Sequence, residues 1–387
     1  MSEPAKSFRV GLIGTGRISD IYLKTLKKYP QVDVVSCGSL NIAESRTKAE
    51  IYGVPRVAAP DEIIADPAID AILNLTIPAA HAPVSLAALE AGKHVYSEKP
   101  LVNDLADGRC VLDLAASKGL TVGNAPDTWL GGRWQTVRKL LDQGAIGKPK
   151  GCAAFVGTHG TERHNPNPDF YYQIGGGPML DLGPYYLSAM VFFLGPIARV
   201  AGMSNRAFDR RMIENGPRNG AWMEVEVDTH VQGMLEFESG TIGSITMSFD
   251  VWDSEMPRFE IYGTEGTISI PDPDPVYGAN RFEGQVWLRT DKTSRWTHQP
   301  RPTGREEWQV AENTHGINED SRGMGLIEMA DAIAHGRTPR CSGELAYHVL
   351  EVMTGILEGP AKGTFVDITS RPPIPEILPE QFPENTG

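Results

Sequence analysis

Residues 10–19, VGLIGTGRIS, combine an apolar strand pattern, a tight glycine turn and the start of an amphipathic segment. This order is typical of the first strand, turn and helix of a βαβ unit. Gly14 would form the turn, and Gly16 would let the backbone approach phosphates at the N-terminus of the helix. Ser19 replaces a third glycine and is small enough for helix–strand packing. The pattern predicts a dinucleotide site that includes Gly14, Thr15, Gly16, Arg17 and Ile18.

The first third of the chain continues this alternation of strands and helices. Strand patterns cover 10–13, 32–37, 71–76, 94–96 and 120–123, and helical patterns cover 18–28, 42–51, 83–90 and 103–117. Such spacing indicates a doubly wound parallel sheet, an α/β Rossmann fold whose ligands bind at the carboxyl ends of the strands. We therefore expect the residues that follow these strands to gather at one edge: Gly14, Thr76, Pro78 and Lys99.

The end of the second strand bears on the choice of cofactor. NAD-binding sheets usually carry a carboxylate here, which holds the ribose hydroxyls of the adenosine. This chain has Ser39 instead, and its next carboxylate is Glu44. Because a serine does not repel a 2′-phosphate, both NAD and NADP stay open as cofactors.

Composition narrows the classes of partner. The 387 residues carry a net charge of −13, which argues against nucleic acid as a partner. The four cysteines form no CxxC pair, so the sequence predicts neither a zinc site nor a disulfide framework. The first residues, MSEPAKSF, lack a basic-then-apolar leader, and no apolar stretch approaches 18 residues. A cytoplasmic protein with no membrane segment is expected.

The pattern changes at about residue 150. Long alternating runs at 225–237, 240–252 and 259–270, with turn signals between them, indicate a large, mostly antiparallel sheet. One face would pack on helices, and the other would be free to pair with another subunit in a homodimer or homotetramer. The predicted organisation is a Rossmann domain at 1–126, an α+β domain for substrate binding and oligomerisation at 127–370, and a Pro-rich tail at 371–387.

Four motifs occur in an order that resembles one family. They are the glycine turn, TIPAAH at 76–81, AGKHVYSEKPL at 91–101 and GGGPMLDLGPYY at 175–186. Together they resemble the Gfo/Idh/MocA oxidoreductases, relatives of glucose–fructose oxidoreductase and inositol dehydrogenase. The resemblance implies a Rossmann domain followed by a domain with an antiparallel sheet. It also implies hydride transfer between NAD or NADP and a carbon of a sugar, sugar derivative or cyclitol.

The resemblance also implies site residues. Lys99 of the EKP motif would reach the reacting hydroxyl and the nicotinamide ribose, with Glu98 and His81 supporting the cofactor loops. Many family members carry a catalytic histidine on the helix that follows GGGP. Here Tyr185 takes that position, and Asp181 lies one turn earlier on the same helix face. Because a free phenol has a pKa near 10, Tyr185 needs a nearby cation to act at neutral pH, and Lys99 is the candidate.

The polar residues His159, Glu162 and His164 precede the segment FYY at 170–172 and could form hydrogen bonds with the hydroxyls of a sugar. An ordinary surface loop or a metal site would also fit, although two histidines and one glutamate on a loop give little support to a metal. We predict no metal. The predicted substrate contacts are Trp129, Arg133, His159, Glu162, His164, Tyr172, Asp181 and Tyr185.

Two other functions remain at this stage. An NAD-using enzyme that cleaves glycosides by oxidation and elimination would share the fold and retain its cofactor. A non-catalytic dinucleotide sensor would be expected to lose the lysine or the acid/base, whereas this chain keeps Lys99, Asp181 and Tyr185. The sequence does not identify the sugar, the hydroxyl or the direction of reaction.

Overall fold

The computed structural model of the protein describes residues 7–271, 281–290 and 308–383. In it, the strands predicted in the first third of the chain form one parallel sheet, in the order β2-β1-β3-β4-β5. The chain order reverses between β1 and β3, which makes their carboxyl ends the switch point where such sheets bind ligands. The strands are β1 (Phe8–Ile13), β2 (Val32–Gly38), β3 (Ala71–Asn74), β4 (His94–Ser97) and β5 (Val122–Asn124).

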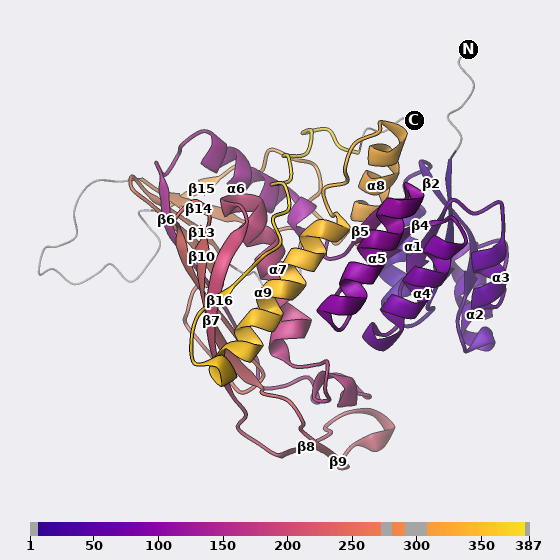
Figure 1. Ribbon diagram of the computed structural model, residues 1–387, viewed down its shortest axis with the longest axis horizontal. Helices are drawn as coiled ribbons and strands as arrows, with labels where there is room; N and C mark the ends of the chain where they lie inside the picture. The colour runs from indigo at the N-terminus through magenta and orange to yellow at the C-terminus, as the bar shows by residue number, and fades with distance from the viewer. Residues whose placement is uncertain (1–6, 272–280, 291–307, 384–387) are drawn as a thin grey trace, which may run out of the picture. The chain divides into compact units, whose positions relative to one another are not determined.

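Helices follow the strands of this sheet and cover it. Figure 1 shows α4 and α5 side by side, and α1 contacts α2 and α8. The helices of this unit are α1 (Ser19–Leu26), α2 (Ile42–Tyr52), α3 (Pro60–Ala65), α4 (Pro78–Glu90), α5 (Leu105–Lys118), the 3₁₀ turn η1 (Thr128–Leu130), α8 (Met324–Ala334) and the first part of α9 (Gly343–Lys362).

The chain divides into two compact units. The first contains the described residues of 1–130, 320–351 and 382–387, and the second contains those of 131–319 and 352–381. The segment 320–351 belongs to the first unit because its backbone forms hydrogen bonds with residues at the end of β5 and just after it. Asn124 N donates to Cys341 O over 2.9 Å, and the carboxylate of Asp127 accepts from two backbone amides at the start of α8.

The second unit is built on a nine-stranded mixed sheet in the order β15-β14-β13-β12-β6-β11-β10-β7-β16. Its described neighbours pair antiparallel except β6 and β11, which run parallel. The strands are β6 (Pro149–Gly157), β7 (Ile197–Asn205), β10 (His230–Phe237), β11 (Ile242–Ser248), β12 (Phe259–Gly263), β13 (Thr267–Ile270), β14 (Val286–Arg289), β15 (Gln309–Ala311) and β16 (Val366–Asp367). The predicted fold class, a parallel Rossmann sheet and a mostly antiparallel α+β sheet, is confirmed.

Side chains alternate across the nine-stranded sheet. In β10 every second residue from Val231 to Phe237 is buried, whereas Met234 is 58 % exposed. Helix α7 (Pro178–Leu194) contacts β6, β10 and β11, and α6 (Gly132–Asp142) contacts β14. A separate two-stranded ribbon consists of β8 (Arg210–Met212) and β9 (Trp222–Glu224), and short 3₁₀ turns lie at η2 (Asp169–Tyr171) and η3 (Gly216–Arg218).

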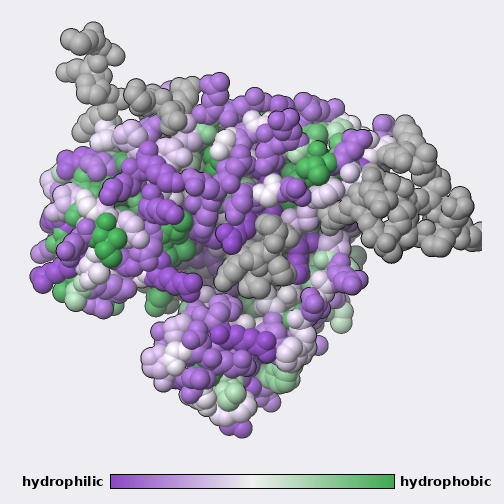
Figure 2. Space-filling view, turned by 180° about the vertical axis from the view of Figure 1, so that it is seen from behind, coloured by the Kyte–Doolittle hydropathy of each residue, from purple (hydrophilic) through white to green (hydrophobic). Residues whose placement is uncertain are grey.

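The surface agrees with the acidic, polar composition. On the face in Figure 2, hydrophilic residues predominate and hydrophobic residues form small separate groups. In the part of the chain that the structure describes, no helix has both the length and the apolar character needed to cross a bilayer.

Candidate active site

The glycine turn after β1 has the geometry that a dinucleotide requires. Gly14 has φ +104°, and a Cβ there would lie 2.4 Å from Leu75 O, so no other residue fits without displacing backbone. A Cβ on Gly16 would meet no described heavy atom within 4 Å. Ser19 Oγ donates to Gly16 O over 2.7 Å and so steadies the turn at the start of α1. These residues fit a pyrophosphate, because Gly14 shapes the turn and Gly16 leaves space beside it.

Three hydroxyl groups meet at the end of β2. Thr15 Oγ1 donates to Ser39 Oγ over 2.9 Å and lies 3.0 Å from Ser45 Oγ, and the two serine oxygens are 3.0 Å apart. Asn41 next to them caps α2 by accepting from Glu44 N. The cluster is neutral at the position where NAD-binding proteins commonly carry a carboxylate. Ser45 was not predicted from the sequence, because it lies inside a helix and belongs to no motif.

The loop after β3 is held by a buried asparagine. Asn74 Oδ1 accepts from Thr76 Oγ1 over 2.6 Å, and Asn74 Nδ2 donates to His81 O over 3.1 Å. His81 Nδ1 lies 2.6 Å from Pro100 O, and its Nε2 lies 3.1 Å from Thr76 O. Burial lowers the pKa of His81, so the ring is neutral at pH 7 and donates through one nitrogen. His81 therefore connects the loop after β3, where Pro78 begins α4, to the loop after β4.

The backbone around Lys99 is fixed from both sides. Glu98 Oε1 accepts from Tyr22 Oη over 2.8 Å, and Glu98 Oε2 accepts from Lys99 N over 2.9 Å. Asn124 Nδ2 donates to Ser97 O and Glu98 O over 2.9 and 3.0 Å. The side chain of Lys99 is half-buried. The carboxylate of the EKP motif thus holds the segment that carries the lysine.

Asp127, which follows β5, is a fully buried acid in the same unit. Its Oδ2 accepts from Gly323 N and Gly325 N over 2.8 and 2.9 Å, and its Oδ1 has no partner among the described residues. Burial raises its pKa to about 6, although the two backbone donors oppose that shift. Asp127 therefore anchors the start of α8. The neighbouring Trp129 is 1 % exposed and also lies in the interior.

In the second unit, α7 carries the predicted acid/base. Gly177, with φ +93°, precedes the helix, and Asp181 N donates to Gly177 O over 3.0 Å in the first turn. Asp181 is half-buried, and Tyr185, one turn later, is 5 % exposed. Tyr186 stacks on Phe259 with ring centroids 6.2 Å apart. Tyr186, which is 2 % exposed, is therefore a packing residue.

The predicted substrate loop presents two histidines in different settings. His159 stacks on Trp252 with ring centroids 3.4 Å apart, and the guanidinium of Arg163 lies 5.1 Å from the same ring. Partial burial, with Arg163 and Arg211 nearby, lowers the pKa of His159. His164 is exposed. The ring of His159 is therefore neutral at pH 7, and the exposed His164 is accessible to solvent.

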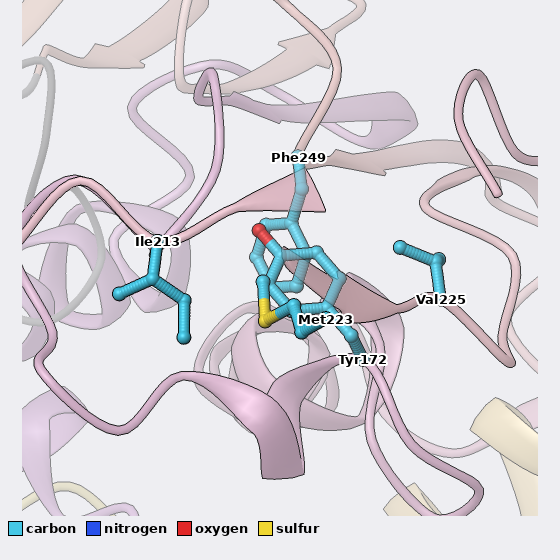
Figure 3. Close-up of a cluster of buried hydrophobic side chains, with 5 residues drawn as sticks. All are labelled: Tyr172, Ile213, Met223, Val225 and Phe249. Atoms are coloured by element: carbon cyan, nitrogen blue, oxygen red, sulfur yellow. The ribbon is translucent and has the colours of Figure 1, made fainter. Parts of the chain in front are cut away.

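Three other predicted contact residues lie in the interior of this unit. Tyr172 is fully buried against an apolar cluster (Figure 3). Its hydroxyl donates to the carboxylate of Glu162, which is 4 % exposed. Glu162 Oε1 also accepts from Arg211 over 2.6 Å. Arg133 is 0 % exposed, with its guanidinium 4.6 Å from the Trp134 ring centroid. A substrate would have to displace these protein partners to reach Glu162 or Tyr172.

Two residues that organise this loop lie outside every sequence motif. Arg211 pairs with Glu162 of the loop and with Asp250, 49 and 39 positions away in the sequence. Asp250 stands out as a charged residue within the alternating run at 240–252, whereas Arg211 lies in the charged stretch DRR at 209–211 and carries no such signal. Among the described residues, no group of three or more His, Cys, Asp or Glu side chains is arranged to hold a metal.

Comparisons with known proteins agree with this architecture. Residues 8–125 match the model of an oxidoreductase family with an NAD-binding Rossmann fold, and residues 134–269 match the GFO/IDH/MocA C-terminal domain. The chain is 31 % identical to dTDP-3,4-didehydro-2,6-dideoxy-alpha-D-glucose 3-reductase of Streptomyces violaceoruber, covering 70 % of this chain and 74 % of the relative. It is 26 % identical to levoglucosan dehydrogenase of Pseudarthrobacter phenanthrenivorans, covering 79 % and 82 %.

Solved structures share the fold. Levoglucosan dehydrogenase in complex with NADH and levoglucosan superposes with a TM-score of 0.78 at 20 % identity, covering 94 % of this chain and all of that chain. Aldose–aldose oxidoreductase of Caulobacter crescentus gives 0.75 at 21 % identity, covering 94 % of this chain and 100 % of the other. The resemblance predicted from the four motifs is confirmed, and the chain belongs to the GFO/IDH/MocA family of oxidoreductases.

Proposed function

We propose that this oxidoreductase transfers a hydride between a nicotinamide dinucleotide and a hydroxyl-bearing carbon of a sugar, sugar derivative or cyclitol. The observation that carries the proposal is the contact of His81, in the first turn of α4, with Pro100 O over 2.6 Å. Lys99 directly follows β4 and the open glycine turn follows β1, so both lie at carboxyl ends of the parallel strands, which supports a shared site. The relatives named as sugar and cyclitol dehydrogenases and reductases support this substrate class.

The residues divide the chemistry with the cofactor. The nicotinamide, when bound, supplies or accepts the hydride. Lys99 and Tyr185 move the proton of the reacting hydroxyl, which must leave when the carbon is oxidised and return when it is reduced. Asp181, one turn before Tyr185 on the same helix face, orients the substrate.

The loop residues have two kinds of role in this proposal. His159 and His164 contact the sugar hydroxyls. Glu162 and Tyr172 hold the loop in place from the interior of the unit, since both are buried and bonded to protein groups. Arg133 and Trp129 stabilise the interior of their respective units and do not contact the sugar.

The adenosine end of the cofactor binds at the hydroxyl cluster of Thr15, Ser39 and Ser45. A neutral cluster neither repels a 2′-phosphate nor offers a carboxylate to ribose hydroxyls. We therefore propose that the protein accepts NADP as well as NAD. Arg17 and Arg46, both exposed, are the nearby cations in the sequence that can reach a phosphate.

We further propose a cytoplasmic homodimer or homotetramer that pairs through the open face of the nine-stranded sheet. Three apolar side chains on adjacent strands of that face are exposed: Met203 on β7 at 77 %, Met234 on β10 at 58 % and Ile242 on β11 at 59 %. Apolar groups on neighbouring strands of an uncovered face favour association.

The test is absorbance at 340 nm with a small panel of sugars. Levoglucosan and myo-inositol are incubated with NAD or NADP, and 1,5-anhydro-D-fructose is incubated with NADH or NADPH. We expect the absorbance to rise with at least one polyol or to fall with the ketose. An unchanged signal across the panel, together with release of 4-nitrophenol from aryl glycosides, would contradict the proposal.

A further inference from the structure

Separate segments of the second unit meet at the buried side chain of Arg211 on β8. Its Nη1 donates to Glu162 Oε1 over 2.6 Å and to His159 O over 3.4 Å. Its Nη2 donates to Phe249 O over 3.0 Å and to the carboxylate of Asp250. Arg211 thus connects the ribbon, the loop that follows β6 and the segment that follows β11.

Each of the two carboxylates, of Glu162 and of Asp250, accepts a further hydrogen bond from a hydroxyl group. Tyr172 Oη donates to Glu162 and accepts from Thr161 N over 3.0 Å. Asp250 Oδ2 accepts from Thr229 Oγ1 over 2.6 Å. These bonds fix the two carboxylates in the orientation that suits the planar guanidinium.

The ionic group lies against an apolar cluster that excludes water. Tyr172 belongs to a cluster with Ile213, Met223, Val225 and Phe249; Figure 3 shows Tyr172, Met223 and Phe249 together at its centre, with Ile213 and Val225 on either side. The side chains of Arg211 and Glu162 are each 5 % exposed. In such surroundings, removing one charge leaves its partner buried and unpaired, so the arrangement tolerates little movement.

The ionic group of Arg211, Glu162 and Asp250 is connected to two parts of the proposed substrate site. Arg211 bonds to the backbone of His159, whose ring stacks on Trp252. Tyr172 lies beside the turn that leads into α7, where Gly177 N donates to Tyr171 O over 2.7 Å. A shift at Arg211 would therefore displace both the histidine loop and the start of the helix that carries Asp181.

We propose that Arg211, paired with Glu162 and Asp250, is a positioning residue that sets substrate affinity by holding the histidine loop and the start of α7. The inference rests on the proposed function, because it assumes that this loop binds the sugar. The alternative is that Arg211 only attaches the β8–β9 ribbon, in which case its loss would lower stability without changing the affinity of the folded enzyme.

The experiment compares Arg211→Met with Arg210→Met, a matched control. Arg210 is the adjacent residue on the same ribbon and is exposed, with its guanidinium 5.9 Å from the centroid of the Trp222 ring. With levoglucosan and NAD, at a temperature where both variants are folded, we expect KM to rise about tenfold or more in Arg211→Met and kcat to change less than about threefold. Arg210→Met should match the wild type, and Arg211→Lys should recover part of the affinity because it restores the charge.

A second readout does not depend on turnover. Amide hydrogen exchange in peptides that cover 158–176 should accelerate in Arg211→Met, while NADH affinity, a property of the first unit, stays unchanged. If Arg211→Met does not fold, Tyr172→Phe removes only the hydroxyl bonded to Glu162 and should raise KM by a smaller factor in the same direction.

The outcomes separate the two proposals. A wild-type enzyme that turns over no sugar would overturn the proposed function, and the exchange measurement would still test the role of Arg211. A wild-type enzyme that is active, with the same KM and the same exchange rates in Arg211→Met as in Arg210→Met, would overturn the positioning role alone.

Discussion

The two units hold their polar site groups in different ways. In the first unit, the polar residues directly follow strands, and several of their bonds span few residues, such as Thr76 to Asn74, two positions apart. In the second unit, Arg211 bonds to Glu162 and Asp250 across 49 and 39 positions. The parallel sheet places groups by its backbone topology, whereas the loop of the second unit depends on side-chain charges.

This difference predicts different responses to mutation. A site placed by strand ends should keep its geometry when one side chain is changed, so that the loss reports that group's chemistry alone. A site placed by a buried ionic group should lose geometry when one charge is removed. The following changes test this contrast, from the largest expected effect to the smallest.

Lys99→Ala should have the largest effect. Because Glu98, Asn124 and His81 hold the surrounding backbone, the loop should persist while the proton-transferring group is lost. We expect kcat to fall by about 10²–10⁴-fold and NADH affinity to change little. Steady-state kinetics and fluorescence titration with NADH measure the two quantities. Lys118→Ala, at a surface pair with Glu90, is the control, and retained activity in Lys99→Ala would remove the assigned role.

Tyr185→Phe tests the acid/base on α7. Removing the hydroxyl keeps the buried ring, so we expect kcat to fall by roughly 100-fold with little loss of stability. Tyr186→Phe, on the neighbouring packing residue, should change kcat far less. A loss smaller than about tenfold in Tyr185→Phe would assign proton transfer to Asp181 or His159 instead.

Asp127→Asn tests the buried acid of the first unit through its pH dependence. The pKa of Asp127 is raised to about 6, so between pH 4 and 6 the folded protein keeps a proton that the unfolded chain has released. Stability from this group is therefore present at low pH and is lost as the pH rises through that window. As the pH rises through this window, the free energy of unfolding of the wild type should fall by up to about 2–3 kcal/mol relative to that of Asp127→Asn.

Urea denaturation of both proteins between pH 4 and 7 measures this difference. Asp142→Asn, at an exposed helix end, serves as the control for a general charge effect. Parallel pH profiles for wild type and Asp127→Asn would show that the pKa of Asp127 is the same in the folded and unfolded states and would contradict the expected shift.

Ser39→Asp should have the smallest effect and should act on cofactor choice alone. A carboxylate in place of the neutral hydroxyl repels a 2′-phosphate and can hold ribose hydroxyls. We expect the ratio of NADPH to NADH affinity to fall by about tenfold or more, as measured by calorimetric titration. Ser39→Ala should leave the ratio nearly unchanged. An unchanged ratio in Ser39→Asp would place the 2′-phosphate away from this hydroxyl cluster.

The sequence predicted the first unit well because its signals are local. Apolar strands, glycine turns and helix patterns at 10–123 give the sheet and the order of its loops. The short helices α3 and α6 were missed. α3 has only six residues, and α6 buries the polar residues Arg133, Gln135 and Thr136, so it shows no apolar period. The attachment of α8 to the first unit depends on Asp127, whose bond to Gly323 joins residues 196 positions apart, so no local pattern predicts it.

The second unit was less predictable for a physical reason. Tyr172 and Glu162 lie in a motif-like polar stretch, and sequence alone does not distinguish a sugar-binding wall from a buried ionic support. The distinction comes from Arg211 and Asp250, which belong to other elements. Where a site is assembled by charges distant in the sequence, local patterns identify candidate residues but not their roles.

Deuterium transfer tests the central claim of hydride exchange between the nicotinamide and a sugar carbon most directly. The enzyme is incubated with NADH deuterated at the reactive C4 position and with 1,5-anhydro-D-fructose, and the product is examined by mass spectrometry and proton NMR. The account predicts one deuterium on a single carbon of the sugar for each NAD formed. A reduced sugar without deuterium, or glycoside cleavage with no net oxidation of NADH, would contradict it.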